Sequence, residues 1–279
     1  MEWWLMYLIL GAVVGFFAGL LGIGGGLLVV PALTFMFTAQ DFPPDRILHL
    51  ALGTTMATII FTSAASLYTH HRHAAVNWII FRYMTPAIVI GTLAGTVLAG
   101  TLSSSILRII FTLFICYAAT SMLLKLISSP KSGTKLCADS NQNFYPLPKK
   151  TVFFTVGGII GTISSLVAIG GGILTVPFLT LRQIRLQHAI GTAAAIGFPI
   201  ALAGTIGYIA NGIAQTQHLP LHSLGYVYLP ALGWLILGSM LTAPLGARTT
   251  HSTRTATLKK LFIVLLYGLA GKMLYDLFV

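Results

Sequence analysis

Long apolar runs, separated by short polar segments, dominate this sequence. A helix that spans a bilayer needs about 20 apolar residues. Six windows reach that length: Leu48–Thr69, Ile79–Thr101, Ser105–Ile127, His188–Asn211, Leu224–Gly246 and Leu258–Phe278. Hydrophobic residues make up 56% of the chain and charged residues only 8%, which is far too apolar for a soluble domain. The pattern predicts an all-α integral membrane protein.

Two further apolar stretches, Trp4–Phe37 and Val152–Leu181, are rich in glycine. As one straight helix the first would run about 50 Å, against a hydrocarbon core of about 30 Å. Three consecutive glycines in each stretch weaken a helix by about 1 kcal/mol apiece relative to alanine. We therefore expect each stretch to break at its glycines and to form a helical hairpin that enters and leaves on one side.

The chain also repeats itself on either side of one long polar segment. Gly11–Pro31 returns as Gly157–Pro177, with its glycines and final proline at matching positions. The Gly-Thr pair at Gly53 returns at Gly191. The polar segment reads as a linker, so we predict a first transmembrane repeat over 1–127, a cytoplasmic linker over 128–150 and a second repeat over 151–279.

The 16 Lys and Arg residues are scattered between apolar windows, which argues for membrane orientation rather than nucleic-acid binding. If both glycine-rich stretches are hairpins and the linker is cytoplasmic, the basic residues outside are only Arg46, Arg108 and Lys272. If both stretches instead cross as simple spans, the two sides of the membrane hold equal numbers of Lys and Arg residues. The hairpin topology therefore fits the positive-inside bias. It gives each repeat three crossings, so the two copies are inverted, as in many transporters.

Glycine breaks at membrane depth release backbone N–H groups that need a partner or a polar cavity. Opposed helix N-termini suit an anion, because each carries a partial positive charge. The expected substrate site contains Gly24, Gly25, Gly26, Gly170, Gly171 and Gly172. The G-x-x-x-G pairs that precede them, at Gly11 and Gly157, are typical of helix packing.

Other candidates have two interpretations each. Thr54, Thr55 and Thr192 either face the cavity or bond their own helix backbone. His49 and His188 either contact the anion or lie at the interface.

The histidines at 70, 71 and 73 favour a solvated basic loop over a metal site, since no carboxylate or thiolate accompanies them. No carboxylate lies deep in the membrane, which disfavours a cation pathway, and the sequence indicates no cofactor and no catalytic motif.

These residues resemble the TauE/SafE-type sulfite exporter family over nearly the whole chain. The resemblance rests on both glycine motifs, both Gly-Thr pairs, the loop His70–Trp78 and the runs Gly207–Gly212, Ser223–Ala231 and Ala243–Arg248. It implies transport of sulfite, thiosulfate, sulfoacetate or related organosulfonates across a bacterial inner membrane, and no enzyme activity. Two departures stand out. Ser165 and Ala168 stand in the second repeat where the first has Gly19 and Gly22, and position 55 is Thr where Ser is expected.

The sequence leaves a second class of function open: a membrane-embedded enzyme or assembly factor for sulfur compounds, with Cys116 or Cys137 as its reactive group. The expected partners are a small sulfur-containing anion and the lipid bilayer, with no nucleic acid; a homo-oligomer is compatible with the sequence. The substrate, the direction of flux and ion coupling are not encoded in these patterns.

Overall fold

The computed structural model describes residues 3–21, 25–127, 150–214, 219–252 and 255–278. Within these ranges the chain forms ten helices and one short antiparallel β-ribbon. The all-α membrane fold class is therefore confirmed. Residues 128–149, which include Cys137, and residues 22–24, which include Gly24, lie outside the described part.

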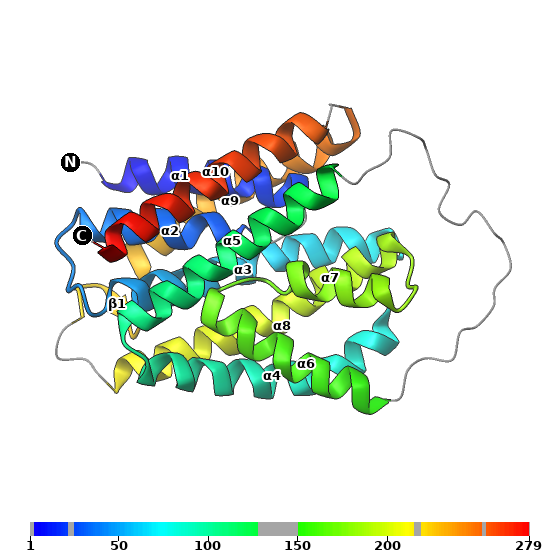
Figure 1. The fold of residues 1–279 in the computed structure, drawn as a ribbon, viewed down its shortest axis with the longest axis horizontal. Helices are drawn as coiled ribbons and strands as arrows, with labels where there is room; N and C mark the ends of the chain where they lie inside the picture. Colours follow the sequence, from blue (N-terminus) through cyan, green and yellow to red (C-terminus); the bar gives the residue numbers. More distant parts are fainter. Residues whose placement is uncertain (1–2, 22–24, 128–149, 215–218, 253–254, 279) are drawn as a thin grey trace, which may run out of the picture.

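Both glycine-rich stretches fold as broken helical hairpins, as predicted. The first consists of α1 (Trp3–Leu21) and α2 (Gly26–Thr38), and the second of α6 (Lys150–Val167) and α7 (Gly172–Leu181). The two helices of each hairpin run in opposite directions, so each returns to the end from which it came (Figure 1). The hairpins enter from opposite ends of the molecule, and both breaks lie between those ends (Figure 1).

Four helices among the described residues are long and apolar enough to cross a membrane: Ile47–Arg72 in α3, Trp78–Thr101 in α4, Ser104–Leu124 in α5 (Ser104–Ile127) and Gln187–Ile213 in α8 (Leu186–Ile213). The last two predicted windows correspond to α9 (Leu229–Ser252) and α10 (Thr255–Phe278). In α9 the apolar part described is Leu229–Ala243, which is shorter than a full span of about 20 residues.

The window predicted from Leu224 was wrong at its start. Ser223–Leu224 and Val227–Tyr228 form strands β1 and β2, which pair in antiparallel register. Gly225 between them has a φ of 55°, a left-handed conformation that glycine adopts without steric cost. The chain therefore turns sharply here, and the helix begins only at Leu229.

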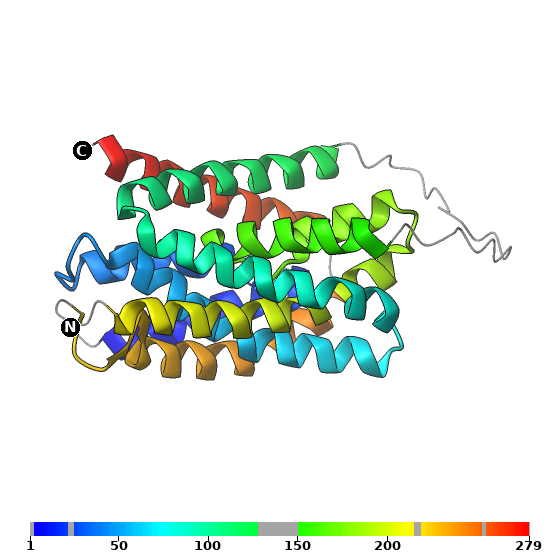
Figure 2. The same ribbon diagram turned by 90° about the horizontal axis from the view of Figure 1, so that it is seen from below.

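Helix packing follows a pattern of exchanged pairs. In the first half α1 packs on α9, and in the second half the equivalent helix, α6, packs on α4. The central pair α3 and α8 and the outer pair α5 and α10 each join equivalent helices. Equivalent helices run in opposite directions, which Figure 1 and Figure 2 show for α1 and α6 and for α3 and α8. Each half is thus completed by helices of the other.

Small residues make the exchanged contacts close. A Cβ atom on Gly11 would lie 2.6 Å from the carbonyl oxygen of Leu235 in α9, and one on Gly157 would lie 3.0 Å from that of Met84 in α4. The prediction that these G-x-x-x-G pairs serve helix packing is confirmed. Helices α3 and α8 fill the centre, whereas α5 exposes large apolar side chains such as Leu113 on its outer face. That distribution suits a protein whose outer solvent is lipid.

Candidate anion site at the two helix breaks

The first break ends at Gly25, which caps α2 in the left-handed conformation, with φ 71° and ψ −10°. Its carbonyl oxygen accepts hydrogen bonds from the N–H groups of Leu28 (3.1 Å) and Val29 (3.4 Å). No side chain caps this helix. Gly26, the first residue of α2, is buried. The N–H groups of Gly26 and Leu27, at the very start of the helix, have no acceptor four residues earlier within α2, so the start of α2 directs backbone donors into the protein.

The second break has the same backbone design. Gly171 caps α7 with φ 75° and ψ −21°, again without a side-chain cap. Its N–H group donates to the carbonyl oxygen of Ile169 at 2.8 Å, and its own carbonyl accepts from the N–H of Thr175 at 2.9 Å. Gly172, the first residue of α7, is buried. Ala168 also has a positive φ, of 48°, so this break is tightly wound on both sides of Ile169.

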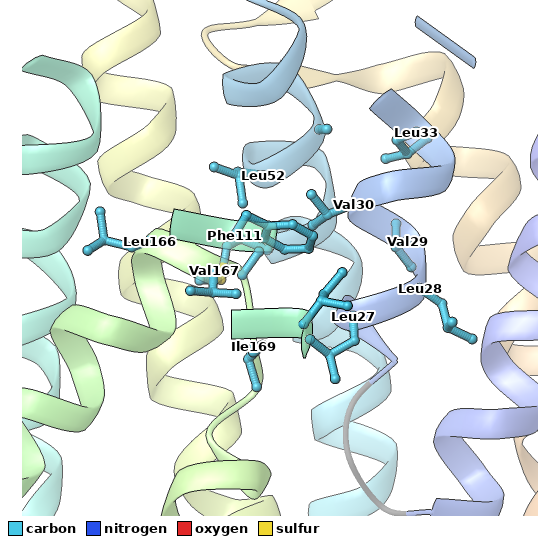
Figure 3. Close-up of a cluster of buried hydrophobic side chains, with 14 of the residues drawn as sticks. Leu27, Leu28, Val29, Val30, Leu33, Leu52, Phe111, Leu166, Val167 and Ile169 are labelled. Atoms are coloured by element: carbon cyan, nitrogen blue, oxygen red, sulfur yellow. The ribbon is translucent and has the colours of Figure 1, made fainter. Parts of the chain in front are cut away.

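The two breaks meet in the middle of the bundle. A Cβ atom on Gly26 would collide with the carbonyl oxygen of Ala168. The carbonyl oxygen of Gly170 lies close to α8, 2.6 Å from the position that a Cβ atom on Gly197 would take. Figure 3 shows the apolar side chains around this junction: Leu27 and Val30 of α2 approach Val167 and Ile169 of the second break. Gly26 of the first predicted set therefore lies against the backbone of the second break, and Gly170 of the second set lies against α8.

The helix N-termini at the junction favour negative charge, and they lie beside the C-termini of α1 and α6, which carry the opposite partial charge. Each helix N-terminus carries roughly half an elementary positive charge, and α2 and α7 both begin here. Among the residues whose side chains the structure describes, the acidic ones are Asp41 and Asp45, and both lie in the loop between α2 and α3, away from the breaks. The junction can therefore stabilise an anion through backbone donors without a charged side chain.

Thr54 and Thr192 take a role that neither sequence interpretation anticipated. The Oγ1 atom of Thr54 in α3 accepts from the N–H of Tyr228 at 3.0 Å, just before α9. The Oγ1 atom of Thr192 in α8 accepts from the N–H of Asn77 at 2.9 Å, just before α4. Each threonine thus holds the start of a helix in the other repeat. Thr55 is buried, and its hydroxyl has no hydrogen-bond partner among the described residues.

The two histidines are not equivalent. His49 is buried, and its Nε2 atom lies 3.0 Å from the carbonyl oxygen of Ala99, while Nδ1 lies 3.3 Å from the hydroxyl of Ser104. It therefore ties the start of α3 to the turn between α4 and α5. His188 is half-buried near the start of α8. It precedes its Gly-Thr pair by one residue fewer than His49 does, which rotates it by roughly 100° around the helix axis.

The basic segment at His70–His73, which forms the last turn of α3 and its C-cap, contains no metal site among the described residues. His71 packs edge-on against Trp78 with ring centroids 5.4 Å apart, and the Arg72 guanidinium lies 5.2 Å from the ring centre of Tyr68. Across the part of the chain that the structure describes, no three His, Cys, Asp or Glu side chains gather where they could hold a metal ion. Cys116 is free and half-buried in α5.

Two cavities lie away from the junction. One, of about 480 Å³, lies between α1, α2 and α10 and is lined by apolar side chains apart from Thr34 and Lys272. The other, of about 540 Å³, lies beside Arg46 in the loop before α3. Nη1 of Arg46 donates to the phenol oxygen of Tyr226 at 2.9 Å. Burial raises the pKa of that phenol above its ordinary value, so Tyr226 remains neutral.

Sequence reasoning missed three hydroxyl groups. Thr92 in α4, Ser164 in α6 and Thr175 in α7 are buried and, like the hydroxyl of the predicted Thr55, have no hydrogen-bond partner among the described residues. Two of them, Ser164 and Thr175, flank the second break within a few residues. The sequence signal was available: the first repeat has Ala18 and Val29 at the matching positions.

Comparisons with known proteins agree with this architecture. A family model described as "Sulfite exporter TauE/SafE" matches residues 7–273. A probable membrane transporter protein of Haemophilus influenzae is 37% identical over 96% of this chain and 97% of its own. A probable membrane transporter protein of Methanocaldococcus jannaschii is 25% identical over 87% and 85%, and the protein YunE of Bacillus subtilis, with the same description, is 23% identical over 96% of each chain.

No solved structure matches the chain. The family model covers the hairpins, the central helices and nearly all of α10, and the relatives named above are described as membrane transporters. The chain is therefore a multi-pass membrane protein and belongs to the TauE/SafE sulfite exporter family.

Proposed function

We propose that this protein is a carrier of small sulfur-containing anions, such as sulfite, thiosulfate, sulfoacetate or related organosulfonates. The anion binds between the two glycine breaks, and the two repeats cross the membrane as inverted units that alternate its access. The membrane is a bacterial inner membrane, with the linker in the cytoplasm. No catalytic step and no cofactor enter this mechanism.

One observation carries the proposal: two helices without side-chain caps begin at two breaks inside an apolar bundle, and the first residue of one of them, Gly26, lies against the backbone of the other break at Ala168. Buried N–H groups without partners are costly in a membrane protein. An oxyanion satisfies them and gains from both helix dipoles. The relatives' description as transporters and the family's association with sulfite support the choice of substrate.

The tight contact between the breaks supports alternating access. Gly26 lies against the carbonyl of Ala168, and Ile200 lies against Gly171, with its Cδ1 atom 2.8 Å from a Cβ position there. An anion of several atoms cannot enter such packing unless the hairpins separate. Because the hairpins enter from opposite ends (Figure 1), movement of one hairpin at a time opens the junction to one side at a time.

A flux assay tests the proposal directly. Purified protein in liposomes should move labelled sulfite without a second protein, and chloride should not replace it. A variant in which Cys116 and Cys137 are both replaced by alanine should retain flux, because no thiol takes part. Loss of all flux in the cysteine-free variant, with normal insertion, would favour the enzyme or assembly-factor alternative. Absence of flux for every sulfur anion in the wild type would refute the carrier.

A further inference from the structure

The two breaks differ in their hydroxyl groups. Ser164 in the last turn of α6 and Thr175 in the first turn of α7 have their counterparts in Ala18 and Val29 of the first hairpin. The relative exposure of Ser164 and of Thr175 is 0%. Neither hydroxyl has a hydrogen-bond partner among the described residues. The polar asymmetry is therefore confined to the second break of this otherwise matched pair.

Most buried threonines of this protein have a hydrogen-bonded hydroxyl, and Thr175 shares the lack of a partner only with Thr55 and Thr92 among the described ones. Thr34, Thr58 and Thr205 each donate to the carbonyl four residues earlier in their own helix, at 2.7 to 2.9 Å. That bond is the ordinary solution for a helical threonine. A buried hydroxyl that makes no bond costs free energy. Thr175 forgoes the bond although the carbonyl of Gly171 stands four residues before it.

The Thr175 hydroxyl lies at the start of α7. Its Oγ1 atom is 3.6 Å from the Cβ position of Gly171, the residue that caps the helix. The N–H groups that have no acceptor within the helix begin at the next residue, Gly172. Side-chain and backbone donors therefore lie together on one side of the junction. The matching side at Gly25 is covered by apolar groups, with Val14 Cγ1 at 2.6 Å and Ala18 Cβ at 3.3 Å from its Cβ position.

We propose that the second break is the oxyanion subsite: the hydroxyls of Thr175 and Ser164, with the first N–H groups of α7, bind the oxygens of the sulfite or sulfonate group. This inference rests on the proposed carrier function and adds an orientation to it. The charged oxygens face α7, and the remainder of an organosulfonate faces the apolar side at Val14 and Ala18. The two breaks are thus alike in backbone and unequal in binding.

Calorimetric titration of the purified protein with sulfite tests the subsite. Thr175→Val and Ser164→Ala install the residue types of the first repeat and remove one donor each. Each should raise the Kd for sulfite about tenfold, as expected for a hydrogen bond to a charged group. Thr175→Ser, which keeps a hydroxyl, should bind within about threefold of the wild type. Thr34→Val is the matched control, because that hydroxyl is bonded within α2, and its Kd should not change.

Thermal unfolding without sulfite supplies the second readout. Removing an unpaired hydroxyl should leave the unfolding midpoint of Thr175→Val equal to the wild type or higher. A clearly lower midpoint would mean that the hydroxyl has a structural partner, and it would overturn the subsite. Unchanged sulfite Kd in both Thr175→Val and Ser164→Ala would also overturn it, while leaving the carrier function standing. If the wild type binds no sulfur oxyanion, the carrier function fails first and the subsite fails with it.

Discussion

At the first break Gly25 has a φ of 71°, and at the second Gly171 has a φ of 75°. Both cap a helix that no side chain caps, and both helices contain a proline at the matching position, Pro31 or Pro177. The side chains around the breaks are not matched: the first has Ala18 where the second has Ser164. The comparison separates two requirements. Backbone geometry is kept in both copies because the bundle needs both breaks, whereas polar groups are concentrated in one.

The largest effect should come from filling either break. Gly25→Leu and Gly171→Leu each place a side chain on a residue with a left-handed backbone conformation. That side chain would clash with Val14 in the first break and with Ile200 in the second. We expect sulfite flux in liposomes to fall to background in both variants while both proteins still insert. Gly233→Leu is the control, since no atom lies within 4 Å of its Cβ position, and it should transport normally. Normal flux in one of the two break variants would show that only the other break is needed.

A smaller effect should follow from charge alone. At Thr54 and Thr192, Asp and Asn both offer an oxygen to the N–H group of Tyr228 or Asn77, but only Asp adds a negative charge. We expect sulfite flux in each Asp variant to be roughly tenfold or more below that in the Asn variant, because a charge in a low-dielectric interior repels an anion. Equal flux in the Asp and Asn variants of both positions would remove these helices from the pathway. Faster flux with Asp would contradict an anion carrier.

Stability should respond equally in the two repeats. Thr54→Val and Thr192→Val each leave one partly buried backbone N–H without its acceptor, which costs about 1 kcal/mol of unfolding free energy. Chemical denaturation of the purified variants measures this cost. Thr58→Val is the control, because its hydroxyl bonds only the carbonyl of Thr54 within α3, and it should lose less. A loss in one repeat only would mean that the two crossing bonds are not equivalent.

The smallest expected signal is thiol labelling of Cys137, which reports the side of the membrane on which the linker lies and therefore the side from which each hairpin enters. If the linker is cytoplasmic, a membrane-impermeant thiol reagent applied to intact cells should leave Cys137 unlabelled and should label it after the membrane is opened. A Cys116→Ala background removes the second thiol. Strong labelling of Cys137 in intact cells would reverse the assignment of the two hairpins to their sides of the membrane.

The hairpins could be predicted from sequence because length and glycine content both exclude a straight helix. The windows that became α3, α4, α5 and α8 were visible for the same reason: about 20 apolar residues in a row have few alternatives. The β-ribbon was missed because its residues are as apolar as the helix that follows. The positive φ values of His222 and Gly225 turn Ser223–Tyr228 away from a helical path.

The chemistry of single side chains was harder to predict. Thr54 and Thr192 were recognised as a pair, yet their partners are backbone groups in the other repeat, which no local pattern specifies. His49 and His188 looked equivalent because both precede a Gly-Thr pair, but a shift of one residue changes the helix face. That the Thr175 hydroxyl lacks a partner was visible only in the folded chain, since most helical threonines find one within their own helix.

The exchanged packing of α1 on α9 and of α6 on α4 has a consequence for biosynthesis. When the ribosome has released the first repeat, the glycine face of α1 at Gly11 and Gly15 still lacks Leu235 and Ser239, which belong to the last part of the chain. The first repeat must wait in the bilayer with that face uncovered until α9 inserts. A gene divided within 128–149 would therefore encode two fragments that assemble with each other when they are co-expressed, as two subunits of a dimer do.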